Sequence, residues 1–209
     1  MSEKTSENSN SFEIKAFNRW STENISVKDP GLVNYITTKP RIMPKTGARY
    51  ASKRFHKSKI FIVERLMNKL LVSGHKSGKH MISSGRNTGK ALSVYKLVED
   101  AFLIIEKKTG KNPVEVFVKA VENAAPREEI ITIEYGGARY PKAVEVAPQR
   151  RIDQAIKYMV QGVYQKSFDN KKSAVDNLVD EIINAYNAST NSAAIAKKYE
   201  TERQCDSSR

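Results

Sequence analysis

Hydrophobic residues recur with helical spacing along this chain from about residue 58 onward. In the run that ends at Ser73-Gly74, apolar positions lie three or four residues apart, which places them on one face of a helix. That first stripe consists of Ile60, Val63, Met67 and Leu70. A second run ends at Thr109-Gly110 and predicts another helix. Its stripe consists of Leu92, Tyr95, Val98, Phe102 and Ile105.

A third helix is predicted from Asn112-Pro113, which supply an N-cap and a first-turn proline, with Glu115 at the capping-box position. Its stripe is Val114, Phe117, Val118 and Val121, and Pro126 ends it. Helical spacing returns after Pro148, with Ile152, Ile156, Met159 and Val163. It continues after a Ser173 cap, with Val175, Leu178, Ile182 and Tyr186, and a last polar helix spans about 192 to 203.

One stretch departs from this spacing. Residues 129–146, EIITIEYGGARYPKAVEV, alternate β-branched and polar positions on both sides of Gly136-Gly137. This pattern indicates a hairpin whose turn requires positive φ. Because an isolated hairpin is marginal in water, it must pack on the helices or protrude as an arm that another molecule stabilises.

The N-terminal region lacks helical spacing. The first dozen residues indicate a disordered tail, and prolines at positions 30, 40 and 44 favour an extended segment lying on a larger body. Trp20 is expected to anchor this segment to the core, with base stacking as the alternative. The predicted fold is therefore mainly α. It is a bundle of about six helices with a protruding two-stranded hairpin, at about 128–147, between the third and fourth helices. Residues 1–50 form the tail and extended basic segment, and residues 51–209 form the helical domain.

Charge identifies the class of partner. The formal net charge is +13, yet residues 30–111 alone hold 18 Lys and Arg against 4 Asp and Glu. No acidic residue occurs from Pro30 to Val63. A field of one sign destabilises a compact chain by self-repulsion, so it suggests a polyanionic partner. No apolar run approaches the ~20 residues that span a bilayer, and the N-terminus lacks a signal peptide's apolar core. We therefore expect a cytoplasmic protein with a nucleic-acid partner and no membrane partner.

The stretch GHKSGKHMISSGRNTGK, residues 74–90, resembles a nucleotide-binding loop only superficially. A Walker loop needs four residues between its glycines, followed by Lys and then Ser or Thr. Both glycine pairs here are one residue too close, and the loop follows a helix rather than a strand. Its cations, Lys76, Lys79, Arg86 and Lys90, with no acid among them, instead indicate a loop that faces phosphate without hydrolysing it.

Catalytic and metal chemistry are not indicated. The three histidines lie among cations, with no carboxylate or cysteine nearby to orient them. The adjacent Glu128 and Glu129 point to opposite faces of a strand, so they do not form an acid–base pair. The single Cys205 excludes an internal disulfide and a multi-cysteine zinc site, and its position suggests an incidental thiol on a frayed end. We expect no enzyme activity, no metal and no cofactor.

Two features favour nucleic-acid binding. Residues 39–59 carry eight cations interleaved with Tyr50 and Phe55, which combines phosphate neutralisation with stacking on bases; core packing of the two aromatics is the alternative. Arg150 and Arg151 stand at a helix start, where a cation opposes the helix dipole at a cost of about 0.3–1 kcal/mol. A bound phosphate reverses that sign. A salt bridge to Asp153 or Glu145 is the structural alternative.

Several runs resemble one known family. They are GARYASKRF, FIVERLMNKLL, NPVEVFVKAVENAAPREE, PKAVEVAPQRR and RIDQAIKYMVQG. In this order they are similar to the small-subunit ribosomal protein seven family in its archaeal and eukaryotic form, from about Phe17 to Arg203. The resemblance implies a helical bundle with a hairpin arm, and a protein that is not a homo-oligomer. It also implies binding to the three-prime major domain of small-subunit rRNA, nucleation of head assembly, and an arm beside exit-site tRNA and the mRNA exit path, near small-subunit protein eleven.

By position, the resemblance implies two sets of functional residues. The rRNA contacts would be Arg49, Lys53, Arg54, Lys57, Lys59, Lys76, Lys79, Arg86, Lys90, Arg127, Arg150 and Arg151. The hairpin tip near tRNA and mRNA would be Tyr135, Gly136, Gly137, Ala138 and Arg139. The chain departs from the family pattern in its arm, which has two cations against four acids where bacterial relatives have a basic arm. Its final residues QCDSSR also lack the basic, alanine-rich ending expected of the family.

An architectural DNA-binding protein that uses helices and a hairpin arm is the alternative function. Minor-groove binders of that kind rely on cations and insert an apolar wedge between base steps. The arm expected here is net acidic, with only Arg139 and Lys142 against its four acids. The sequence therefore favours the ribosomal assignment.

Overall fold

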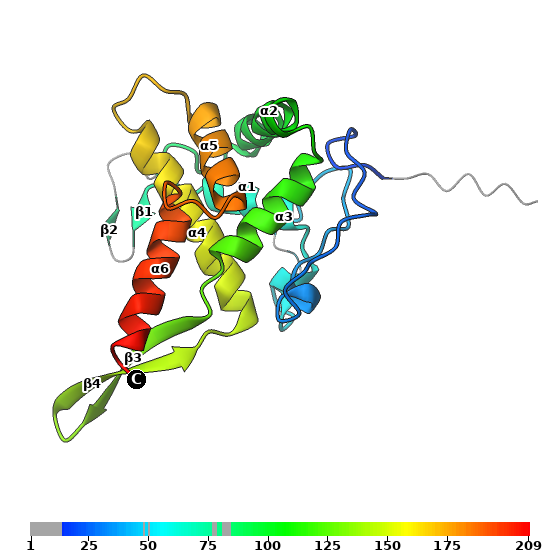
Figure 1. The fold of residues 1–209 in the computed structure, drawn as a ribbon. Helices are drawn as coiled ribbons and strands as arrows, with labels where there is room; N and C mark the ends of the chain where they lie inside the picture. The colour runs from blue at the N-terminus through cyan, green and yellow to red at the C-terminus, as the bar shows by residue number, and fades with distance from the viewer. Residues whose placement is uncertain (1–13, 48, 50, 77–78, 81–84) are drawn as a thin grey trace, which may run out of the picture.

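The computed structural model describes residues 14–47, 49, 51–76, 79, 80 and 85–209, with only the backbone for residues 75, 76, 79 and 80. Six α-helices lie in the described part, as predicted (Figure 1). They are α1 (Ile62–Leu70), α2 (Ala91–Thr109), α3 (Pro113–Ala124), α4 (Pro148–Ser167), α5 (Ala174–Tyr186) and α6 (Ala193–Asp206). The expectation of a mainly α fold is confirmed.

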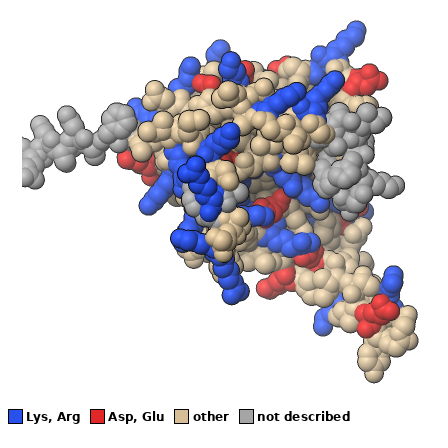
Figure 2. Space-filling model, turned by 180° about the vertical axis from the view of Figure 1, so that it is seen from behind, with Lys and Arg blue, Asp and Glu red and all other residues tan. Residues whose placement is uncertain are grey.

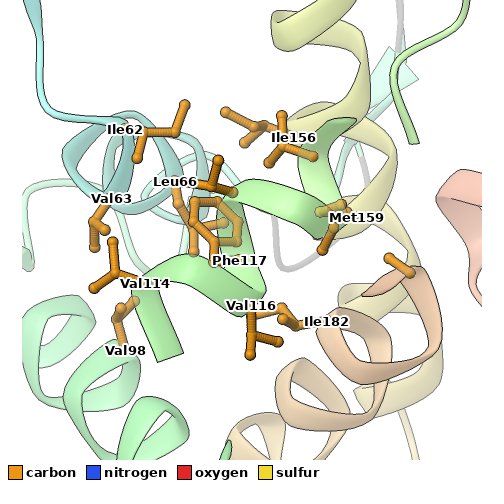
Figure 3. Packing of buried hydrophobic residues seen from close by; sticks show 14 of the residues in the cluster. Ile62, Val63, Leu66, Val98, Val114, Val116, Phe117, Ile156, Met159 and Ile182 are labelled. Carbon is orange, nitrogen blue, oxygen red and sulfur yellow. The ribbon is translucent and has the colours of Figure 1, made fainter. Parts of the chain in front are cut away.

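Helix α3 lies at the centre of the bundle because it is apolar around most of its circumference. The Asn112 side chain accepts a hydrogen bond of 3.0 Å from the Val114 N–H, and Pro113 occupies the first turn, so the helix starts where the sequence predicted. Figure 3 shows side chains of α3 packed among residues of α1, α2, α4 and α5. The labelled residues are Ile62, Val63, Leu66, Val98, Val114, Val116, Phe117, Ile156, Met159 and Ile182. One continuous core therefore joins helices that are distant in sequence.

Most residues of the predicted apolar stripes are buried; Tyr95, Val175 and Tyr186 are half-buried, and Leu92 is exposed. In α2, Val98, Phe102 and Ile105 are fully buried, but Leu92 is 75% exposed. Including Leu92 in the core stripe was wrong because the first turn of α2 is left uncovered on that side. There, Leu92 lines an apolar groove of about 570 Å³ together with Ile42 and other residues of the preceding extension and α1.

The extension is attached to the bundle through aromatic packing. Trp20 is 5% exposed and packs edge-on against Phe17 and Phe102, with ring centroids 5.8 and 5.9 Å away. Leu32 and Ile36 are buried in the same core. The interpretation of Trp20 as a core anchor is confirmed, and base stacking by Trp20 is excluded by its burial. The rest of the extension is irregular apart from the short 3-10 helices η1 (Val33–Tyr35) and η2 (His56–Lys59).

The hairpin arm follows α3 and precedes α4. Strands β3 (Glu128–Tyr135) and β4 (Ala138–Glu145) pair antiparallel through all eight positions, and Gly136 and Gly137 make the turn with φ of 57° and 81°. Figure 1 shows the base of the arm beside α6 and its tip extending beyond the helices. The arm therefore packs at one end and protrudes at the other.

Two local features were not predicted. Strands β1 (His75–Lys76) and β2 (Lys79–His80) form a two-residue antiparallel pair, which is too short to leave an alternating pattern in the sequence. Helix α6 runs to Asp206, and Cys205 on it is fully buried. The expectation of an incidental thiol on a frayed end was wrong about the end, because α6 packs against the base of the arm and the Arg209 guanidinium lies 2.6 Å from a Glu128 carboxylate oxygen.

Candidate nucleic-acid interface

The cations that precede α1 point into solvent while their backbone is tied to the helix. Thr46 donates two hydrogen bonds, from its N–H and its hydroxyl, to one carboxylate oxygen of Glu64, at 2.8 and 2.6 Å. Glu64 is 1% exposed, so it secures the segment instead of offsetting the surface charge. The predicted cations Arg49, Lys53, Arg54, Lys57 and Lys59 are all exposed.

The structure describes one of the two aromatic residues of this segment. Tyr50 lies outside the described residues. Phe55 is 50% exposed, with the Arg54 guanidinium carbon 4.9 Å from its ring centre, so the alternative of core packing is wrong for Phe55. Its φ of 57° lies in the left-handed region, which is rare for a bulky residue and recurs at functional sites.

The segment continues onto α4 through ion pairs. Lys57 places its ammonium 3.0 Å from Asp153, and the buried Arg65 of α1 places its guanidinium 3.0 Å from the other oxygen of the same carboxylate. Asp153 therefore joins the basic segment, α1 and α4. Burial acts to raise the pKa of Asp153, but the charge of Arg65 and the hydrogen bonds from both cations lower it below its ordinary value. Figure 2 shows Lys and Arg side chains spread over the body on the face opposite to that in Figure 1, with Asp and Glu side chains at several places among them.

A pocket of about 410 Å³ lies between α1 and α4 beside these ion pairs; we refer to it as the α1–α4 pocket. Its charged and ionisable lining consists of His56, Lys57, Arg65, Lys69, Asp153 and Lys157. Sequence reasoning did not identify Lys69 or Lys157, because neither belongs to a run of cations. Each lies one helical turn after another charged residue, Lys69 after Arg65 and Lys157 after Asp153, and the two lysines line the same pocket only because α1 packs against α4.

The two arginines at the start of α4 have different environments. Arg150 is 60% exposed, and its Nε lies 2.8 Å from Glu129. The Arg151 side chain is 11% exposed; it donates to the Pro126 carbonyl at 3.0 Å and to the Asp29 carboxylate at 2.8 Å. Arg150 can therefore reach a ligand, whereas the guanidinium of Arg151 is occupied inside the fold.

The partners of these arginines are not those that the sequence alternative named. Asp153 binds Lys57 and Arg65, and the arginines bind Glu129 and Asp29 instead. Asp29 lies in the extension, more than a hundred residues earlier in the chain, so no local pattern marks it. Burial acts to raise the pKa of Asp29, but the hydrogen bonds from Arg151 and from the Gly31 N–H keep it below its ordinary value.

The loop before α2 places further cations at a helix start. Helix α2 begins after Lys90 without a side-chain cap and without an acid in its first turn. Arg86 and Lys90 are both exposed. An uncapped helix start flanked by cations favours an anion. Of the other predicted loop cations, Lys76 and Lys79 lie in the β1–β2 pair, where side chains are outside the described part. The stretch 74–90 begins after α1, as predicted, although the two-residue strands β1 and β2 lie within it.

Three of the four acids of the arm form ion pairs, two at its base and one near its tip. Glu129 binds Arg150, Glu128 binds Arg209, and Glu134 lies 3.7 Å from Arg139 near the tip. The predicted contact Arg127 is exposed at the base, and its N–H donates to the side chain of Glu202. The acidity of the arm, taken from the sequence as a sign against phosphate contact, is thus largely balanced within the described structure.

The tip of the arm is exposed to solvent. Tyr135 is 81% exposed, and Gly136, Gly137, Ala138 and Arg139 are exposed beside it. Tyr135 and Ala138 pair across the turn and lie on the same face of the ladder as Ile133 and Tyr140. The tip therefore offers one large aromatic ring and one cation on a narrow, glycine-turned end.

These surfaces suit the binding of a polyanion. In the described part, no group of three or more His, Cys, Asp or Glu side chains is placed to hold a metal ion. No helix of that part is long and apolar enough to cross a membrane. A packed helical core that presents cations from a connecting segment, a helix pair and two helix starts is typical of a nucleic-acid-binding protein.

Comparison with known proteins identifies the family. The model of the family "Ribosomal protein S7p/S5e" matches residues 32–209. The small ribosomal subunit protein uS7 of Nanoarchaeum equitans is 52% identical over 196 residues, which cover 94% of this chain and 99% of that protein. The proteins of the same name from Methanosphaera stadtmanae and Archaeoglobus fulgidus are 45% and 42% identical and cover 91% and 94% of this chain and 96% of each relative.

The chain belongs to the ribosomal protein S7p/S5e family, so the resemblance drawn from its sequence motifs is confirmed. This is a family of structural ribosomal proteins and not of enzymes. Membership places the chain in translation, as a small-subunit protein of the cytoplasmic ribosome with ribosomal RNA and other ribosomal proteins as its partners.

Proposed function

We propose that this protein binds the three-prime major domain of small-subunit rRNA and nucleates assembly of the subunit head. The observation that carries this proposal is the acid-poor surface formed by the segment 39–59, α1 and α4, joined through Asp153. Cations held in a fixed pattern by a packed core can match the phosphates of one folded RNA better than those of an unstructured chain. We further propose that residues 51–209 form the RNA-binding domain, and that the extension contributes its exposed cations to the same surface.

The proposed rRNA contacts follow the exposures described above. The exposed cations are Arg49, Lys53, Arg54, Lys57, Lys59, Arg86, Lys90, Arg127 and Arg150. Lys76 and Lys79 remain proposed contacts on position in the chain alone. For Arg151 we propose a structural role, because both ends of its guanidinium are occupied by protein groups.

For the arm we propose a position near exit-site tRNA and the mRNA exit path, close to small-subunit protein eleven. The exposed Tyr135 ring can stack on a base, and Arg139 can bind a phosphate once it leaves Glu134. Tyr135→Ala with Arg139→Ala should leave the affinity for the rRNA fragment unchanged, since neither residue lies on the basic surface. Crosslinking of the variant to tRNA or mRNA in assembled subunits should fall; an unchanged crosslink yield contradicts the placement of the arm.

The decisive test is a salt-series titration of the protein against the three-prime major domain fragment. Random RNA and duplex DNA of equal length serve as competitors. Each phosphate contact adds about 0.9 to the dependence of log K on log salt for duplexes, and about 0.7 for single strands. We expect the rRNA fragment to bind orders of magnitude more tightly at physiological salt. Equal affinity for all three ligands would instead support a generic polyanion surface and the architectural DNA-binding alternative.

A further inference from the structure

The α1–α4 pocket contains more positive charge than its acid can neutralise. Four cations line it, and Asp153 is the only carboxylate among its lining residues. Both oxygens of Asp153 are already engaged, one by Lys57 and one by Arg65, each at 3.0 Å. Lys69 and Lys157 remain. Within the described residues, neither has a carboxylate at ion-pair distance.

The two unpaired lysines line the same pocket, and the charge of Lys157 disfavours the charged form of Lys69. Both are half-buried, and they come from facing helices. Burial lowers the pKa of Lys69, and the charge of Lys157 lowers it further, while Asp153 acts in the opposite direction. Solvated surface lysines normally extend away from one another into water. Two lysines converging on one pocket of a folded protein instead indicate a missing anion.

We infer that Lys69 and Lys157 bind one phosphate group of an RNA backbone in the α1–α4 pocket. Two ammonium groups from different helices can each donate to a different oxygen of a single phosphate. The volume of about 410 Å³ far exceeds the ~30 Å³ share of one water, so the phosphate fits with part of its sugar or hydration. The Asn68 amide and the His56 ring at the pocket wall can supply further donors.

The surroundings favour RNA as the source of the phosphate. The pocket opens beside the segment 39–59, whose eight cations lie in a stretch without acids, so a backbone that leaves the pocket meets more positive charge. The inference rests on the proposed rRNA-binding function and adds a specific phosphate site to it. A carboxylate of a neighbouring protein is the competing occupant, and the test distinguishes the two.

Lys69→Met and Lys157→Met test the site, with Lys171→Met as the matched control in the exposed connection between α4 and α5. Methionine keeps an unbranched apolar side chain and removes the charge. If the two lysines serve to bind an anion and not to stabilise the fold, each pocket variant should be at least as stable to urea as the wild type, because it removes an uncompensated charge. If they support the fold, the variants should be less stable.

Binding is measured in two ways on the full-length protein. Inorganic phosphate at constant ionic strength and pH 7 should cause saturable shifts in the backbone amide signals of residues 65–72 and 153–157. Both pocket variants should lose these shifts, and the control should keep them. The salt slope for the rRNA fragment should fall by about 0.7–0.9 in each pocket variant and stay constant in the control.

The outcomes separate this inference from the proposed function. If the pocket variants keep the phosphate-induced shifts, or if the wild type shows none, the phosphate site is wrong even when rRNA binding is tight. If phosphate binds the pocket but the rRNA salt slope does not change, the assignment to an RNA backbone is overturned in favour of another anion. If the slope falls while rRNA and random RNA bind equally, the phosphate site stands and the proposed selectivity fails.

Discussion

Arg150 and Arg151 are adjacent in the sequence, yet the structure gives them opposite roles, and this is a testable difference. Arg150→Ala should weaken RNA binding and leave the fold intact. Arg151→Ala should destabilise the fold with little direct effect on the number of phosphate contacts. The contrast follows from exposure, since the Arg150 side chain is 60% exposed and that of Arg151 is 11% exposed.

The magnitudes follow from the partners. Arg151 loses a hydrogen bond to the Pro126 carbonyl and a charged pair with Asp29. Removing one member of a buried ion pair costs about 3–5 kcal/mol, but the Asp29 side chain is 25% exposed and can regain water. We therefore expect a loss of about 2–3 kcal/mol, nearer the ~1.5–3 kcal/mol of a hydrogen bond to a charged group. The exposed pair of Arg150 with Glu129 is worth about 0–1 kcal/mol.

The assay combines urea unfolding with the rRNA salt series. With an m-value of about 2–3 kcal/mol/M, Arg151→Ala should move the unfolding midpoint down by about 1 M. Arg150→Ala should move the midpoint little and lower the salt slope by about 0.7–0.9. Asp29→Asn provides the partner control, and a double-mutant cycle with Arg151→Ala measures the coupling between the two side chains.

An exchange of behaviour between the two variants would contradict these opposite roles. Arg151→Ala with an unchanged midpoint and a reduced salt slope would mean that its guanidinium leaves Asp29 to bind phosphate. A coupling free energy near zero in the double-mutant cycle would show that the pair contributes nothing to folding.

Three further predictions concern packing and charge. Gly162→Ala should destabilise the protein by about 1–3 kcal/mol, because its new methyl carbon would lie 2.5 Å from the Ala193 side chain where α4 meets α6. Thermal unfolding measures this loss, and an unchanged unfolding midpoint would contradict the close approach of the two helices. Glu181→Ala should lower the free energy of unfolding by about 2–3 kcal/mol, because the fully buried carboxylate accepts hydrogen bonds from the Ser192 hydroxyl and from Lys166. Urea unfolding tests this prediction. A loss below about 0.5 kcal/mol, the lower end for a single hydrogen bond, would contradict it. Because the folded pKa of Asp153 is lowered, its stabilisation is complete above the ordinary aspartate pKa of about 3.9 and is lost as the pH falls below that value. Asp153→Asn should remove this part of the acid-side loss in a stability–pH profile, and an identical profile would contradict it.

The predicted helix starts and the hairpin turn agree with the structure because the residues that set them are adjacent in the sequence. The Asn112-Pro113 start and the Ser173 cap carry their hydrogen-bonding groups in the sequence, and both helices begin there. Gly136-Gly137 likewise supplies a turn that needs positive φ at both positions. Leu92 was misplaced because spacing identifies an apolar face but not whether a neighbouring element covers it.

The candidate site was predictable to the extent that charge is clustered in the sequence. The run of cations in residues 39–59 marks a charged surface by its composition alone, and its cations are exposed in the described part. The two α4 arginines look equivalent in sequence because the Asp29 that binds one of them lies in the extension. Lys69 and Lys157 were not identified from the sequence, since neither belongs to a run of cations and they line one pocket only because α1 packs against α4.

The sequence by itself determined the helices, the hairpin, the excess of positive charge and the family, because these depend on neighbours within a few residues or on the order of motifs. Only the tertiary structure decided which cations are free to bind and which are already paired. That distinction depends on contacts between distant segments, such as Asp29 with Arg151 and α1 with α4, where a few ångströms separate an engaged cation from an available one. The electrostatic interaction energy between two charges falls with their distance and with their exposure to water, and both depend on the folded structure.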